Sequence, residues 1–260
     1  MKYFSLIILL IFVSGCKKTD MKSYETDFAK YFKNYDGALV LYDYNNRYFI
    51  KHNEERCKKR FSPCSTFKIP NSLIGLETGI ITDKDFTLKW DGVKRSRDEW
   101  NKDHSLKTAI QYSVVWYYQE LARRVGKEKM SEYINKMGYG NKDISGGIDK
   151  FWLMSSLEIS AEEQVEFLKS LFENKLPFSE RAMNITKEIM VLDSNSNYVF
   201  RGKTGSGESP DGKGNIGWFV GYVTLGTNTF IFAANISGED ANGMKAKEIT
   251  IEILKSMRIM

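Results

Sequence analysis

The pattern of apolar and polar positions divides the chain into strands at both ends and helices between them. Short apolar runs separated by turn-rich links predict strands, and the links near the C-terminus are short enough for antiparallel neighbours. The predicted strands cover residues 38–42, 48–50, 198–204, 217–224 and 229–236. This order predicts an α+β fold, in which one antiparallel sheet is flanked by helices and a helical lobe is inserted between its strands.

Between these strands, apolar residues recur at three- and four-residue spacing, the period of a helix with one buried face. The first such helix is predicted to begin at Pro63, with Ser62 as its N-cap, and to end at Gly79. The other predicted helices cover residues 106–124, 127–137, 161–172, 180–190 and 244–257. The region from about residue 83 to 190 is therefore expected to be mostly helical.

Composition is that of a soluble globular protein with one large core or two lobes. The chain has 260 residues, of which 42% are hydrophobic and 27% charged. Its formal net charge of +5 is mild, and the lysines are scattered rather than gathered in a basic block. We therefore expect no nucleic-acid partner.

The first residues have the pattern of an export signal. Residues 3–13 are apolar apart from Ser5, follow the basic Lys2, and are too few to span a bilayer comfortably. They end in a Val-Ser-Gly-Cys sequence that resembles a bacterial lipobox, with Cys16 as the lipidated residue. We expect a signal peptide over 1–15, a tether over 16–23 and a folded domain over 24–260, giving an exported periplasmic or cell-surface lipoprotein. The alternative is an ordinary signal peptide with a chance cysteine.

Ser65 and Lys68 are the first candidates for chemistry. They are three residues apart and share one face near the start of a predicted helix. A serine hydroxyl needs a base to become a nucleophile, and a lysine can be that base only when its amine is neutral, as apolar surroundings favour. The spacing alone is weak support, since Ser14 and Lys17 show it too.

Two further motifs lie downstream. Ser113 precedes two valines in a predicted helix and could relay a proton, or could simply bond to its own helix backbone. Lys203, Thr204 and Gly205 end a predicted strand, where a positive charge and free backbone N–H groups suit a substrate carboxylate. Taken singly, each motif is better explained as ordinary structure.

In combination, the order Ser-x-x-Lys, Ser-x-Val, Lys-Thr-Gly resembles the penicillin-recognising serine enzymes, and more closely the class D β-lactamases, or oxacillinases. Supporting segments are Tyr-Gly-Asn at 139–141, the run ending in Phe-Trp-Leu at 144–153, Leu-Lys-Trp-Asp-Gly at 88–92 and Gly-Trp-Phe-Val-Gly at 217–221. The resemblance covers roughly residues 37–257. It implies a single β-lactamase/transpeptidase-like catalytic domain.

The resemblance also implies catalytic roles. Ser65 would attack the β-lactam carbonyl, and Lys68, carboxylated by carbon dioxide, would be the general base for acylation and deacylation. Trp152 would donate its indole N–H to that carbamate, and Ser113 would pass a proton to the leaving nitrogen. No metal and no cofactor other than carbon dioxide or bicarbonate is implied.

Substrate-binding roles follow from the same resemblance. Lys203 and Thr204 would hold the substrate carboxylate beside Gly205. The backbone N–H groups of Ser65 and Ser206 would form the oxyanion hole. The remaining site residues, expected to shield the carbamate from bulk water, are Val115 and Leu153.

Some features depart from the family or leave alternatives open. Residues 242–247 lack the arginine that many oxacillinases use to grip the carboxylate, so Lys245 or Lys247 is a candidate substitute. Cys57 and Cys64 are close enough in sequence for a disulfide, but two reduced thiols are equally compatible. A Gly-x-Gly-x-x-Gly match at 212–217 precedes a strand rather than a helix, which excludes dinucleotide binding. The two histidines are expected at the surface and form neither a zinc site nor a triad.

The leading hypothesis is a serine hydrolase that opens the ring of penicillins and related antibiotics and so gives resistance to them. Three alternatives share the motifs: a receptor module that stays acylated, a peptidoglycan transpeptidase or carboxypeptidase, and an inactive lipoprotein. Expected partners are small β-lactams and a membrane contacted only through the lipid, with the protein as monomer or homodimer. The sequence ranks neither the β-lactam classes nor the inner against the outer membrane.

Overall fold

In a computed structural model, residues 28–208 and 214–260 are described. The predicted signal peptide with its boundary at residue 15, the predicted tether, and Cys16 as the expected site of lipidation lie outside these residues. Within them, the α+β architecture with an antiparallel sheet and flanking helices is confirmed.

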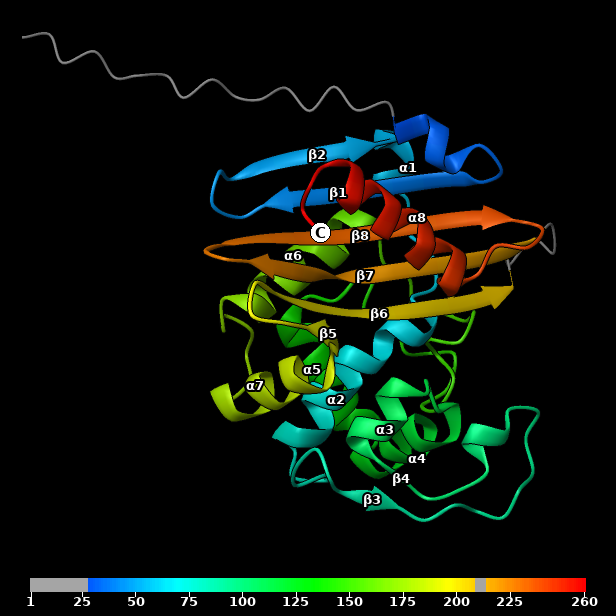
Figure 1. The fold of residues 1–260 in the computed structure, drawn as a ribbon. Coiled ribbons are helices and arrows are strands. Elements are labelled where there is room, and N and C mark those ends of the chain that lie inside the picture. Colours follow the sequence, from blue (N-terminus) through cyan, green and yellow to red (C-terminus); the bar gives the residue numbers. More distant parts are fainter. Residues whose placement is uncertain (1–27, 209–213) are drawn as a thin grey trace, which may run out of the picture.

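The centre of the molecule is a six-stranded sheet in the order β2-β1-β8-β7-β6-β5, shown in Figure 1. Every neighbouring pair is antiparallel, and β1 pairs with β8, which joins the first and last parts of the described chain. The strands are β1 (Asp36–Asp43), β2 (Tyr48–His52), β5 (Val191–Ser194), β6 (Tyr198–Glu208), β7 (Asn215–Leu225) and β8 (Asn228–Gly238). All the residues between β2 and β5 form the inserted lobe, as expected.

Both faces of the sheet are covered, which explains why its central strands read as continuous apolar runs. Along β1, Val40 belongs to the core shared with the helical lobe, whereas Leu39 and Leu41 belong to a second core on the opposite face. That second face is covered by α8 (Gly243–Ser256) and the short helix η1 (Phe28–Phe32). Figure 1 shows α8 lying across the sheet, with α6 behind it.

The helical lobe is built around α2 (Lys68–Glu77), where every residue from 68 to 76 is buried. This helix packs against α4, α5 and α7. The helices of the lobe are α1 (Glu54–Lys58), α3 (Leu106–Gln111), α4 (Val115–Val125), α5 (Lys127–Met137), α6 (Ala161–Phe172) and α7 (Glu180–Ile189), with the short turns η2 (Cys64–Phe67) and η3 (Asp98–Trp100) and a small sheet of β3 (Thr87–Leu88) and β4 (His104–Ser105).

Two local predictions about the lobe are wrong. The single helix expected over residues 106–124 is two helices, because the chain turns at Ser113, whose φ of 55° lies outside the helical region. Ser62 is not an N-cap: its hydroxyl donates to the Trp152 carbonyl at 2.9 Å, and the chain after Pro63 forms the 3-10 turn η2 before α2 begins. The helices predicted at 127–137 and 161–172 are confirmed.

The strands and one of the two histidines also differ from expectation. The C-terminal strands extend further than their apolar runs, and β5, which is exposed along its length, was not predicted. His104 is 1% exposed rather than at the surface. Its ring nitrogens lie 3.0 Å from Thr108 Oγ1 and 2.8 Å from the Glu99 carbonyl oxygen, so it is a hydrogen-bonded core residue.

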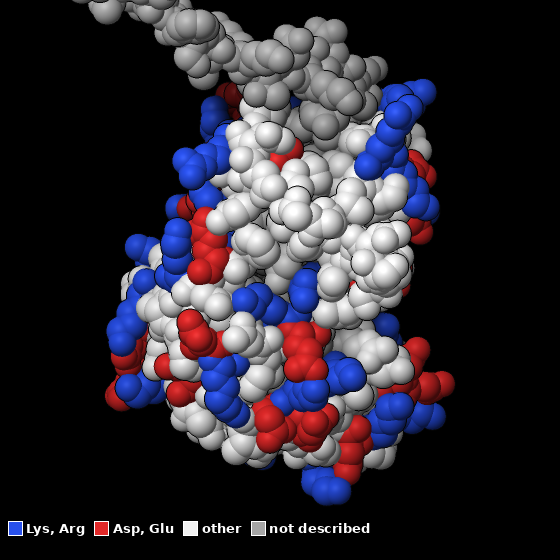
Figure 2. Space-filling model, turned by 60° about the vertical axis from the view of Figure 1, so that its left-hand side comes forward, with Lys and Arg blue, Asp and Glu red and all other residues white. Residues whose placement is uncertain are grey.

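The distribution of charge on the surface (Figure 2) agrees with the mild net charge and scattered lysines of the sequence. Figure 2 shows one face on which lysines, arginines and carboxylates intermingle over the helical half, while the half over the sheet is largely uncharged. This face has no field of a single sign like that of a nucleic-acid-binding surface. Among the described residues, no helix is both long and apolar enough to cross a membrane.

Candidate functional site

Ser65 and Lys68 lie together at the junction of η2 and α2. The Lys68 Nζ and Ser65 Oγ atoms are 2.8 Å apart, a hydrogen-bonding distance. Ser65 is the one residue between 62 and 70 that is not fully buried, whereas Lys68 has no exposed surface. The tight turn therefore presents one hydroxyl to solvent, with an amine buried directly behind it.

The environment of Lys68 favours the neutral amine. Burial, followed by repulsion from Lys203, lowers the pKa of Lys68 well below its usual value. Its Nζ atom lies 5.4 Å from the centre of the Tyr118 ring. Among the described residues, Lys68 forms no ion pair with a carboxylate that would keep it charged. A neutral amine beside a hydroxyl is the arrangement that a base-activated nucleophile needs.

Trp152 brings an unused hydrogen-bond donor to the same region. Its ring is fully buried and stacks on Phe67, the residue before Lys68, with centroids 5.3 Å apart. Among the described residues its indole Nε1 has no acceptor. A buried N–H without a partner costs about 1–3 kcal/mol. The free indole N–H of Trp152 therefore fits an additional hydrogen-bond acceptor in this buried region, such as a carboxyl group on Lys68.

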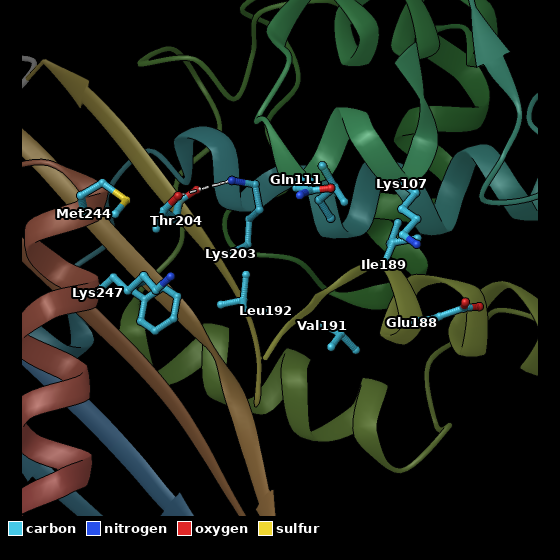
Figure 3. Close-up of a pocket in the computed structure, with 13 residues that line it drawn as sticks. Lys107, Gln111, Glu188, Ile189, Val191, Leu192, Lys203, Thr204, Met244 and Lys247 are labelled. Atoms are coloured by element: carbon cyan, nitrogen blue, oxygen red, sulfur yellow. Dashed lines mark hydrogen bonds between the residues drawn. The ribbon is translucent and has the colours of Figure 1, made fainter. Parts of the chain in front are cut away.

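Ser113 is held near the site by the break between α3 and α4. The turn directs its hydroxyl toward β6, and Lys203 Nζ donates to Ser113 Oγ at 3.0 Å. Lys203 also donates to the Thr204 carbonyl at 2.9 Å, the contact drawn in Figure 3. The second and third motifs therefore meet in the fold, and Ser113 reaches Lys203 from a turn and not from within a helix.

Lys203 is buried without a carboxylate partner among the described residues. It is 5% exposed, and burial, followed by repulsion from Arg97 and Lys247, lowers its pKa to about 7. Near neutral pH it is therefore partly deprotonated in the free protein. A substrate carboxylate would supply the missing counter-charge.

The strand β6 passes close to the turn that carries Ser65. A Cβ atom at Gly205 would lie 2.9 Å from the Pro63 carbonyl oxygen and 3.3 Å from the Thr66 nitrogen. Glycine is therefore required for the strand to approach this closely. At the next position, Ser206 Oγ accepts from the Gly243 N–H at 2.8 Å, which ties β6 to the start of α8.

The two expected wall residues are placed as follows. Val115 is the first residue of α4, directly after the turn at Ser113, and Leu153 follows Trp152 and packs against the main core. Both are half-buried. Their positions at the edge of the site are compatible with the shielding role expected for them.

A buried hydrogen-bond chain behind the nucleophile was not predicted. Gln164 of α6 donates to Thr66 Oγ1 at 3.0 Å, and Thr66 Oγ1 donates to the Pro63 carbonyl at 2.7 Å. The Tyr139 hydroxyl donates to Gln164 Oε1 at 3.4 Å. This chain fixes the turn that holds Ser65. The sequence held one indication of this chain, because Gln164 is a polar residue on the apolar face of α6.

The two cysteines of the described residues, Cys57 and Cys64, do not form a disulfide with each other. Cys57 and Cys64 are both free and buried, so the question left open by the sequence is settled in favour of two thiols. Cys64 Sγ lies 3.3 Å from Met154 Sδ, and burial raises its pKa to about 12. The Cys64 thiol is therefore protonated near neutral pH and is no rival to Ser65. No cluster of metal-binding side chains occurs among the residues that the structure describes.

A pocket of about 720 Å³ lies beside Lys203 and Thr204, as Figure 3 shows. Lys247 of α8 lines it, and repulsion from Lys247 contributes to the lowered pKa of Lys203. Lys245 instead pairs with Glu248 at 3.4 Å, outside the pocket lining. Of the two lysines proposed in place of the family's arginine, only Lys247 faces the site.

Comparisons with known proteins agree with this geometry. Residues 33–255 match the penicillin binding protein transpeptidase domain. The β-lactamase OXA-48 of Klebsiella pneumoniae is 42% identical over 240 residues, which is 92% of this chain and 89% of that protein. The solved structure of the class D β-lactamase BAT-2 superposes with a TM-score of 0.86 at 40% identity, covering 91% of this chain and 97% of that chain.

A longer protein also contains a similar domain. The methicillin resistance mecR1 protein of Staphylococcus aureus is 38% identical over 233 residues, which is 89% of this chain but 40% of that protein. The matches to OXA-48 and BAT-2 cover nearly the full length of the chain. The Ser65–Lys68 pair and the contact between Ser113 and Lys203 bring the motifs of this family together in one site. The chain belongs to the class D β-lactamases, serine hydrolases that share the penicillin-binding transpeptidase domain.

Proposed function

We propose that this protein hydrolyses β-lactam antibiotics through an acyl-enzyme on Ser65, with Lys68 in its carboxylated form as general base, and thereby confers resistance. The observation that carries the proposal is the Ser65–Lys68 pair: a half-exposed hydroxyl 2.8 Å from a buried amine whose pKa is strongly lowered. OXA-48 and BAT-2 are named as β-lactamases, which supports the same reaction here.

In acylation, Ser65 Oγ loses its proton and bonds to the carbonyl carbon of the lactam, and the carbon–nitrogen bond of the ring then breaks. The backbone N–H groups of Ser65 and Ser206 stabilise the oxyanion. The leaving nitrogen needs a proton, which Ser113 donates, and the proton that Ser65 gave to the base at Lys68 is passed back to Ser113. Lys203, 3.0 Å from Ser113 Oγ, stabilises the hydroxyl as it gives up that proton. Water then hydrolyses the ester and restores Ser65.

Carboxylation of Lys68 explains two features of the site. Carbon dioxide reacts with a neutral amine, and the lowered pKa of Lys68 maintains that form. The unpartnered indole N–H of Trp152 would find an acceptor in the carbamate. When present, the carbamate supplies a negatively charged oxygen that acts as base for Ser65 and for the hydrolytic water. Val115 and Leu153 shield it from bulk solvent.

Substrate capture rests on the carboxylate that β-lactams carry beside the reacting ring. Lys203 and the Thr204 hydroxyl bind this group, with Gly205 allowing close approach to the strand. Lys247 adds a second positive charge from α8 and takes the place of the family's arginine. Because an ammonium lacks the bidentate geometry of a guanidinium, orientation of the carboxylate depends more on Lys203 and Thr204.

The test of this function is hydrolysis of a chromogenic cephalosporin with and without bicarbonate. We expect turnover that rises with added bicarbonate, and a loss of about a hundredfold or more in kcat for Lys68→Ala. Lys127→Ala, which removes an exposed lysine at the start of α5 and outside the pocket, is the control for bicarbonate dependence. Turnover that is indifferent to bicarbonate at every concentration would contradict carboxylation, and absence of turnover would contradict the hydrolase.

A receptor module that stays acylated is the second candidate, because the match to 40% of the longer methicillin resistance mecR1 protein shows that a similar domain also occurs as part of a larger protein. Intact-protein mass spectrometry separates the two. During turnover of penicillin with bicarbonate, a hydrolase is mostly free, whereas a receptor remains stoichiometrically acylated on Ser65.

A further inference from the structure

The pocket beside Lys203 extends away from the oxyanion hole. Its lining includes Gly202, Lys203 and Thr204 of β6 but not Ser206, the residue assigned to the oxyanion. A substrate whose carbonyl is at Ser65 and whose carboxylate is at Lys203 therefore has the pocket beyond its carboxylate. In a cephalosporin, the substituent that neighbours the carboxylate is the one on C3, so this substituent would enter the pocket.

Exposed apolar side chains line the pocket from β5 and from α8 (Figure 3). Val191, Leu192 and Met244 are 38%, 44% and 57% exposed, and all three line it. They are half of the large hydrophobic residues that are exposed in the described part of the chain. A flat ring placed against Val191 and Leu192 would remove apolar surface from water, at about 25 cal/mol for each Å² buried.

The charges of the pocket are mostly positive. Figure 3 shows Lys107 and Lys247 at opposite ends, with Lys203 between them. The acid among the lining residues is Glu188, which is already paired with Lys84 of the neighbouring loop. Within the described residues, neither Lys107 nor Lys247 forms an ion pair. Lys107 therefore lies beyond the substrate carboxylate with its charge uncompensated.

We propose that this pocket is a subsite for a β-lactam substituent that combines a flat ring with a second negative charge, bound by Lys107 against the wall of Val191 and Leu192. The inference rests on the proposed function, because that function places the carboxylate at Lys203. It assigns to Lys107 a role in specificity and none in bond breaking.

Cefamandole and cefonicid make a matched pair of probes. They share the acyl side chain and the tetrazolylthiomethyl substituent on C3, and differ in whether the tetrazole carries a methyl or a sulfomethyl group. Binding is measured by calorimetry on the full folded domain carrying Ser65→Ala, which cannot be acylated. We expect cefonicid to bind about twofold to fivefold more tightly, the range for one exposed ion pair, and added salt to reduce the difference.

Lys107→Gln in the same background should abolish the preference for cefonicid, whereas Lys127→Gln, which removes an exposed lysine at the start of α5, should retain it. Equal binding of the two probes, binding of neither, or a preference that survives Lys107→Gln would each overturn the subsite. Hydrolysis of a chromogenic cephalosporin by the Ser65 protein reports on the proposed function separately. Failure of the subsite with intact hydrolysis is thus distinguishable from failure of both.

Discussion

Lys68 and Lys203 show how burial sets the chemistry of one residue type. Both pKa values are lowered mainly by burial, but the partners differ: Lys68 is next to the Ser65 hydroxyl, and Lys203 is next to the Ser113 hydroxyl. The Lys68 amine is useful when neutral, whereas Lys203 is useful when charged. Higher pH therefore favours the useful form of Lys68, and lower pH favours the useful form of Lys203.

This opposition predicts a bell-shaped dependence of kcat/KM on pH, measured in saturating bicarbonate. As pH rises, Lys68 loses its proton and activity increases; as pH rises through about 7, Lys203 loses its charge and KM increases. Lys203→Ala should have a low kcat/KM without the falling limb. Because folding favours the neutral form of Lys203, the substitution should not lower the melting temperature. A falling limb that persists in Lys203→Ala would assign it to another group.

Trp152 yields a second prediction at this scale. Trp152→Phe keeps an aromatic ring against Phe67 but removes the indole N–H. If that N–H stabilises the carboxylated lysine, deacylation should slow by about a hundredfold, and acyl-enzyme should accumulate in intact-protein mass spectra. High bicarbonate should partly restore turnover. A variant that stays mostly unacylated during turnover would show that the N–H has no such role.

At the scale of elements, the site depends on places where regular structure stops. Cys64, Ser113 and Met154 all adopt φ values near 50°, and they lie before Ser65, at the break between α3 and α4, and after Trp152. A left-handed conformation costs a non-glycine residue about 1–2 kcal/mol. The buried helix α2 and strand β6 pack next to the turn that carries Ser65. The turn at Ser113 directs its hydroxyl toward Lys203, where a continuous helix would direct it elsewhere.

Helix α6 supports the site through its N-terminal cap. The Ser160 hydroxyl accepts from the Glu163 N–H at 3.2 Å, and the Glu163 side chain accepts from the Ser160 N–H at 2.9 Å. Ser160→Ala should lower the free energy of unfolding by about 1 kcal/mol in urea denaturation. Ser170→Ala, later in the same helix and without a capping role, is the matched control and should have little effect. Equal losses in both variants would exclude the cap as the cause.

At the scale of the whole molecule, the site lies where the helical lobe meets the sheet. Ser65, Lys68 and Ser113 come from the lobe, and Lys203 comes from β6. The residues joined by the contact between Ser113 and Lys203 are 90 positions apart in sequence. Both halves must therefore be folded and docked before the catalytic groups meet.

The N-terminal segment adds a prediction about location. The lipobox predicts that Cys16 carries a lipid and anchors the exported domain to a membrane. In cells fed radiolabelled palmitate, the full-length protein should be labelled, and Cys16→Ala should not. Cys57→Ala, which removes a buried thiol of the folded domain, should retain the label. Labelling that survives Cys16→Ala would contradict the anchor.

The sequence was sufficient for several conclusions. The periods of its apolar residues predicted strands β1, β2, β6, β7 and β8 and the helices α5 and α6, because apolar residues recur along each of them with the period of that element. The order of short motifs identified the family and named Ser65, Lys68, Ser113, Trp152 and Lys203. Each of these residues belongs to a short motif that can be recognised from neighbouring residues alone, without knowledge of the fold.

Other features were decided only by tertiary structure. The break at Ser113, the exposed strand β5, the free thiols and the burial of His104 all depend on what a distant segment places beside them. The choice of Lys247 over Lys245 depends on which side of α8 faces β6. The low pKa values of Lys68 and Lys203 have the same origin: burial and the approach of other cations shift a proton equilibrium, and neither exists until the lobe has packed against the sheet.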